Sequence, residues 1–249
     1  MNGYQRFCFN LIGRDLKEKR GDFVSLRNDL TGARMNTPFE AYLATAYVSS
    51  IAVGLVAAVF IGLLTYIIRV PEMISYHGAV PEIFYALNDY KLLLGTVIIT
   101  LLSLLVFGGI TYLIFLLYPG IRAGERRRNI DATLPYAINY VTAMSSAGIT
   151  PDEVFRLLGQ SKIYGESAVE ARYVSRETDF FGKDLLDALR TVSQATPSER
   201  MREFLQGAVA SISSGSNLTE YFRAKARQYT LENNQQQKTF LETLGLIAE

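Results

Sequence analysis

The sequence predicts an all-α membrane protein, in which a two-helix transmembrane hairpin is followed by a cytoplasmic bundle of about six helices. Two long runs, residues 41–68 and 92–121, contain no Asp, Glu, Lys, Arg or His. The chain beyond them has apolar residues at helical spacing and no alternating pattern of the kind that strands show. Composition alone does not decide the fold class, because 49% hydrophobic content and a mean hydropathy of +0.13 also fit a large soluble domain.

Each charge-free run is long enough to cross a bilayer. A helix rises ~1.5 Å per residue and the hydrocarbon core is ~30 Å thick, so roughly 20 residues suffice. The alternative is a buried core helix, but such a helix normally carries a polar stripe, which both runs lack. We therefore expect four parts: a cytoplasmic amino-terminal arm (1–38), a transmembrane hairpin (39–121) with a short external loop (69–91), a cytoplasmic helical domain (122–238), and the start of a further, truncated membrane segment (239–249).

Lys and Arg near the two runs predict the orientation of the hairpin, because cytoplasmic flanks carry an excess of positive charge. The external loop has only Arg69 and Lys91, whereas the outer flanks hold a larger set: Arg14, Lys17, Lys19, Arg20, Arg27, Arg34, Arg122, Arg126, Arg127 and Arg128. We expect a multi-pass protein of the cell membrane with both ends of the hairpin in the cytoplasm. Cys8 then lies on the cytoplasmic side and His77 in the external loop.

A ladder of small residues follows one face of the first run at four-residue spacing: Ser50, Gly54, Ala58 and Gly62. Small side chains at this spacing allow another helix to approach closely. Glycine is also generally tolerated in membrane helices, so the ladder has a second, neutral interpretation.

The segment 122–238 carries helix starts, helix stops and apolar stripes. Thr150, Thr196 and Asn217 are candidate N-caps, and proline follows the first two at the first helical position. Gly148, Gly165, Gly182 and Gly215 are candidate left-handed helix ends. The first, third and fourth lie 34 and 33 residues apart, as in helix-hairpin repeats, but the characteristic positions of those repeats are absent. Two stripes have helical spacing: Ile130, Leu134, Ala137, Ile138, Val141 and Met144, and Met201, Phe204, Leu205, Ala208, Val209 and Ile212.

No pattern for catalysis is present. His77 is the only histidine, and no cysteine or further histidine lies at metal-ligand spacing from it. Neither a phosphate-binding glycine loop nor the Ser, His and acid combination of a hydrolase occurs. The two runs also lack the ionisable groups that transport pathways need. We predict no catalytic residue, no cofactor and no metal, hence no enzyme. The net charge of +1 gives no reason to expect nucleic acid.

Two basic groups are candidate contact sites. Arg126, Arg127 and Arg128 could meet anionic lipid headgroups or an acidic partner protein. Arg223, Lys225 and Arg227 could dock an acidic partner face or only keep a helix solvated.

An ordered set of residues resembles the conserved-domain pattern of the type II secretion system F family. The set is Leu134-Pro135, then 143–148 (Ala-Met-Ser-Ser-Ala-Gly), then Gly182 with Leu185 and Leu189, then Ser213-Ser214-Gly215 with Leu218. Family members are the platform proteins of type II secretion, type IV pili, Tad pili and the archaellum. The long hairpin ahead of the domain is more similar to the archaeal branch.

The resemblance implies a non-enzymatic membrane platform beneath a growing filament. Its expected partners are a cytoplasmic hexameric secretion ATPase, pilin-like or archaellin subunits, the lipid bilayer, and further copies of itself in a homo-oligomer. The family normally has two such helical domains, of which this sequence supplies one. The alternative from another class is a membrane-anchored receptor or signalling adaptor whose helical domain binds a cytoplasmic partner.

Overall fold

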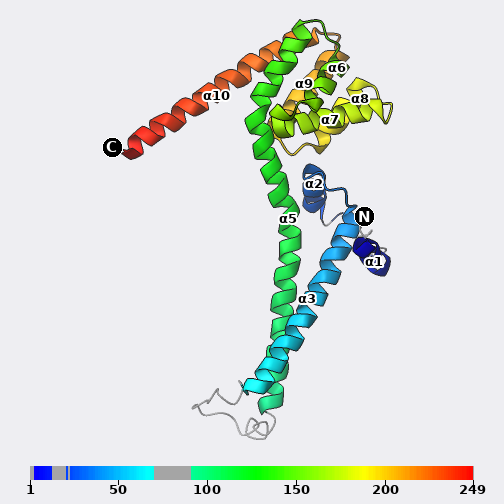
Figure 1. The fold of residues 1–249 in the computed structure, drawn as a ribbon, viewed down its shortest axis with the longest axis vertical. Helices are drawn as coiled ribbons and strands as arrows, with labels where there is room; N and C mark the ends of the chain where they lie inside the picture. The colour runs from blue at the N-terminus through cyan, green and yellow to red at the C-terminus, as the bar shows by residue number, and fades with distance from the viewer. Residues whose placement is uncertain (1–2, 13–20, 22, 70–90, 249) are drawn as a thin grey trace. The chain divides into compact units, whose positions relative to one another are not determined.

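The computed structural model describes residues 3–12, 21, 23–69 and 91–248, and the described residues form helices and no strand (Figure 1). The predicted all-α fold class is confirmed. The external loop with His77 lies outside the described residues. The helices are α1 (Gly3–Ile12), α2 (Val24–Gly32), α3 (Phe39–Ile68), α5 (Lys91–Ser146), α6 (Pro151–Gln160), the 3-10 helix η4 (Lys162–Tyr164), α7 (Gly165–Asp179), α8 (Leu185–Ala195), α9 (Glu199–Ser213) and α10 (Leu218–Ala248).

The chain forms two compact units. The first contains Met1–Arg27 and Asn36–Gly120, and the second contains Asn28–Met35 and Ile121–Glu249. The eight residues 28–35, which lie in the predicted arm, therefore belong with the second unit.

In the first unit α3 and the amino-terminal part of α5 run side by side (Figure 1). The rings of Tyr47 and Tyr112 stack with their centroids 5.1 Å apart, and α1 packs on α3 with Cys8 buried. Both α3 and α5 are long and apolar enough to cross a membrane, and only 17% and 6% of their apolar windows are buried within the chain. Such exposure argues against core helices of a soluble protein, and the two helices fit a membrane protein.

The second charge-free run and the first helix of the bundle are one helix, α5. The charge pattern suggested a boundary near residue 121, where apolar residues give way to arginines. The two compact units do divide there, between Gly120 and Ile121, but the helix passes through this point unbroken.

The core of the second unit is built from the predicted stripes. Ile130, Leu134 and Val141 of α5 pack with Val154 and Phe155 of α6, and helices α7 to α10 supply the remaining members. Helix α10 is attached through Tyr221, whose hydroxyl donates to the Phe204 carbonyl at 2.8 Å, and through Tyr229, whose hydroxyl donates to the Arg200 carbonyl at 3.1 Å. Burial raises the pKa of Tyr229 to about 12.

The observed helix ends agree in part with those predicted from the sequence. The side chain of Asn217 accepts from the amide of Thr219 at 3.0 Å, as an N-cap does. Thr196 is not an N-cap: α9 begins at Glu199, three residues later, and its N-cap is Ser198, whose hydroxyl accepts from the Met201 amide at 3.1 Å. Thr150 precedes α6 but makes no side-chain capping bond. Gly148, Gly165, Gly182 and Gly215 all have positive φ.

Candidate functional site: a buried arginine–glutamate network

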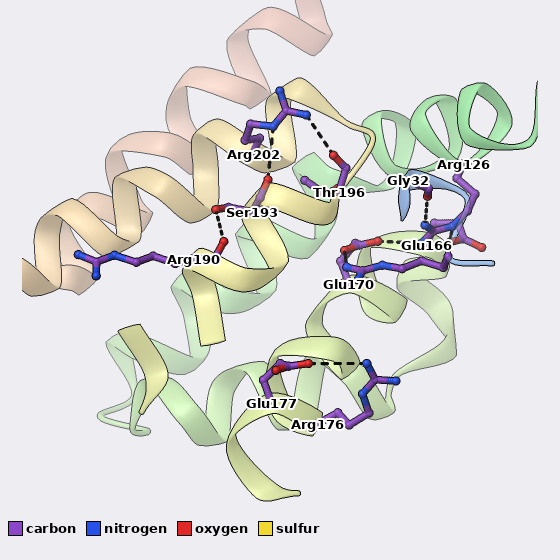
Figure 2. Close-up of polar contacts among 11 residues, drawn as sticks. Gly32, Arg126, Glu166, Glu170, Arg176, Glu177, Arg190, Ser193, Thr196 and Arg202 are labelled. Carbon is purple, nitrogen blue, oxygen red and sulfur yellow. Dashed lines mark hydrogen bonds and ion pairs between the residues drawn. The ribbon is translucent and has the colours of Figure 1, made fainter. Parts of the chain in front are cut away.

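Arg126 of α5 joins three segments of the second unit (Figure 2). Its Nε donates to Glu166 at 2.9 Å and its Nη2 to Glu170 at 2.7 Å, both on α7. Its Nη1 donates to the carbonyl of Gly32 at 2.5 Å, at the end of α2. One guanidinium therefore ties residues 28–35 to α5 and α7.

Glu170 is the centre of the network. Its side chain is 1% exposed, and its second oxygen accepts from Arg34 Nη2 at 2.6 Å. A buried carboxylate is unfavourable unless it is paired and hydrogen-bonded, and here each oxygen has its own guanidinium. The Glu166 side chain is 30% exposed, so its pairing with Arg126 is more strongly screened by water.

Arg34 reaches Glu170 from a left-handed backbone conformation, with φ at +52°. Its amide donates to the Thr31 carbonyl and the Met35 amide to the Leu30 carbonyl, so the chain ends α2 in the pattern where glycine is the usual residue. The guanidinium carbon also lies 3.9 Å from the centre of the Tyr173 ring. Arginine at this strained position indicates that its side-chain contacts matter more than the backbone preference.

The local sequence explains how α7 presents two acids to the interior. Glu166 and Glu170 are four residues apart and so share a helix face. The same face carries buried Ser167, Ala171 and Val174, and the Ser167 hydroxyl lies 2.8 Å from that of Thr133 on α5. The pairing acids therefore sit on the side of α7 that packs on α5.

The network positions chain segments, and its central carboxylate is fully paired. Both oxygens of Glu170 are occupied by guanidiniums, which are protonated at any physiological pH. Within the described ranges, no group of three or more His, Cys, Asp or Glu side chains could hold a metal ion. The arrangement can hold residues 28–35 on the bundle.

The prediction of a basic surface at residues 126–128 is corrected for Arg126. Its side chain is turned inward and fully engaged, so its charge is not available to lipid or to a partner. Arg127 is exposed and lies 3.9 Å from Asp131, and Arg128 is exposed. A run of three arginines on a helix cannot face one way, because successive residues are turned by about 100°.

The three basic residues of α10 do not form one face. Arg223 and Arg227 are four residues apart and share a face, and Arg223 pairs with Glu220 at 2.6 Å. Lys225 lies on another side, where its Nζ is 5.5 Å from the centre of the Tyr229 ring. A docking role for these residues stays a prediction.

The small-residue ladder of α3 faces α5. A Cβ on Gly54 would lie 3.1 Å from the Leu104 carbonyl oxygen, and a Cβ on Gly62 would lie 2.7 Å from the Thr100 hydroxyl. Ser50 and Ala58 are buried on the same face. Gly108 of α5 also allows the two helices to approach closely, since a Cβ there would lie 3.3 Å from the Ser50 carbonyl oxygen.

The fold and the network together define a class of protein, an all-α chain with two helices that fit a membrane and a helical domain to which a buried ion-pair network holds residues 28–35. Residues 137–249 match the family described as type II secretion system (T2SS), protein F. The resemblance noted in the sequence is therefore confirmed as a likeness over these residues, which make up less than half of the chain.

Three curated proteins of Methanocaldococcus jannaschii are similar to this chain. An uncharacterised protein is 34% identical over 113 residues, which is 45% of this chain and 19% of that one. Flagella accessory protein J is 26% identical over 159 residues, 57% and 28% of the two chains, and a second uncharacterised protein is 29% identical over 114 residues, 46% and 32%. The chain spans less than a third of the length of each relative. No solved structure matches it.

Proposed function

We propose that this chain is part of a non-enzymatic membrane platform for the assembly of type IV pilus-like filaments, whether archaellum, pilus or type II secretion pseudopilus. The observation that carries the proposal is the family domain at 137–249, preceded by two helices long and apolar enough to cross a membrane. In this role the chain couples a cytoplasmic hexameric secretion ATPase to the insertion of pilin-like or archaellin subunits.

The proposed placement follows from charge. Both ends of the hairpin lie in the cytoplasm, because positive residues collect on that side of membrane helices. The second unit then stands in the compartment where an ATPase has access to it. One relative is named as a flagella accessory protein, which supports a filament of the archaeal type.

The proposed docking face is the pair Arg223 and Arg227. Reversal of both to Glu should abolish copurification of the ATPase and filament assembly, because like charges then face an acidic partner. The far-ultraviolet circular dichroism should stay unchanged, since neither side chain belongs to the core. Lys225 is left intact because of its contact with Tyr229.

A matched control is the pair Arg156→Glu and Arg190→Glu, two exposed arginines that also pair with an acid three residues earlier. These changes should leave both readouts intact. Undiminished ATPase copurification in the Arg223→Glu/Arg227→Glu variant would remove this face as the docking site. Recovery of a sensor or kinase from the unaltered chain, with no secretion ATPase, would favour the adaptor instead.

A further inference from the structure

Pro119 interrupts the hydrogen bonding of α5. A proline has no amide hydrogen, so the carbonyl four residues before it, that of Phe115, loses the donor it would have in a regular helix. Pro119 is buried and Gly120 follows it, and these two residue types disfavour a helix more than any others. The two compact units divide at the next peptide bond, between Gly120 and Ile121.

Tyr42 of α3 supplies the missing donor. Its hydroxyl donates to the Phe115 carbonyl at 2.8 Å, and the two rings lie 6.1 Å apart between centroids. The Tyr42 side chain is almost completely buried, so water does not compete for this bond. In a membrane, side chains of neighbouring helices commonly satisfy backbone groups that a proline has freed.

We propose that Pro119 and Gly120 form a hinge in α5 and that Tyr42 is its latch. While the hydroxyl holds the Phe115 carbonyl, the helix is fixed at the point where its own bonding is weakest. When the bond opens, α5 bends more freely at the junction of the two units.

The test is a double-mutant cycle on the full chain in lipid nanodiscs, with Tyr42→Phe, Pro119→Ala and both together. Nitroxide labels at Leu105→Cys and Asn129→Cys, in a Cys8→Ser background, span the hinge; both sites are exposed. An ideal helix places them about 36 Å apart, which is within the range of pulsed electron resonance. Tyr42→Phe should broaden the distance distribution and lower the Tm by about 2–4 °C.

In the Pro119→Ala background the helix regains its own amide donor, so Tyr42→Phe should change neither the distribution nor the Tm. Tyr47→Phe is the matched control, because its hydroxyl lies 3.4 Å from that of Tyr112 on the same two helices and touches no carbonyl of the hinge. Its effect should be the same with and without the proline. If Tyr42→Phe has equal effects in both backgrounds, or none in either, the latch does not exist.

Discussion

At the residue scale, the negative charge of Glu170 holds the arginine–glutamate network together. Glu170→Gln keeps the size of the side chain but leaves the guanidiniums of buried Arg126 and half-buried Arg34 without their shared anion. Loss of one member of a buried pair costs roughly 3–5 kcal/mol. We therefore expect a large fall in the free energy of unfolding, measured by thermal circular dichroism on the full chain in detergent.

Glu166→Gln is the control for this substitution, because Glu166 accepts from the same Arg126 but is partly exposed. Its cost should stay under about 1 kcal/mol, as for other exposed pairs. Equal losses from the two variants would mean that burial of Glu170 does not matter to stability.

Single residues were predicted well where local chemistry decides their role. The core positions of α5 and α9 follow from spacing alone, because each helix turns an apolar stripe inward. The inward turn of Arg126 was not predictable from its own neighbourhood, since its partners are 40, 44 and 94 residues away in sequence. A usable signal was present on α7, where Glu166 and Glu170 share a face with small apolar residues.

At the element scale, the packing of α3 on α5 depends on small residues. Gly108→Ala should destabilise the hairpin, because the new Cβ would lie 3.3 Å from a backbone carbonyl that cannot move aside easily. The adjacent Gly109→Ala meets no atom within 4 Å, and alanine favours a helix over glycine by about 1 kcal/mol. In detergent melts, the first variant should have a lower Tm than the parent chain and the second an equal or higher one.

A reversed order of these two variants would show that α3 does not lie against this face of α5. The experiment is well matched, because the two glycines are neighbours in one helix and receive the same substitution.

Helices as elements were more predictable than their ends. Apolar periodicity and glycine turns indicated the bundle helices, but the N-cap of α9 is Ser198 and not Thr196, because the Ser198 hydroxyl accepts from the Met201 amide. The sequence also did not predict that α5 continues through Pro119. Proline normally ends a helix, and here the bond from Tyr42 on a different helix offsets the lost donor.

At the scale of the whole molecule, the proposed topology predicts which sites an impermeant thiol reagent reaches on intact cells. In a Cys8→Ser background, His77→Cys should be labelled and Ile163→Cys should not. Ile163 is 88% exposed on the second unit, so its protection can only come from the membrane. The same Ile163→Cys variant should be labelled fully by the reagent in lysed cells.

Labelling of Ile163→Cys on intact cells would place the second unit outside and overturn both the topology and the ATPase coupling. Native Cys8 is an unsuitable reporter of sidedness, because it is buried against its own chain and would stay unreactive on either side.

The assignment of residues 28–35 to the second unit is the main feature that sequence reasoning could not supply. In the sequence this segment is part of a polar arm, and the contacts of Gly32 and Arg34 attach it to the bundle. Contacts between residues that are far apart in sequence leave no periodic pattern, whereas the membrane hairpin is visible in the sequence as two continuous apolar runs.

The separation of Arg34 and Glu170 along the chain sets a waiting time during synthesis. The two residues are 136 positions apart, and ribosomes add about 5–20 residues per second, so Glu170 is made roughly 7–27 s after Arg34. Both apolar helices are translated in that interval. The arm therefore leaves the ribosome long before its anchoring carboxylate exists, and it can be fastened only after α7 has been made.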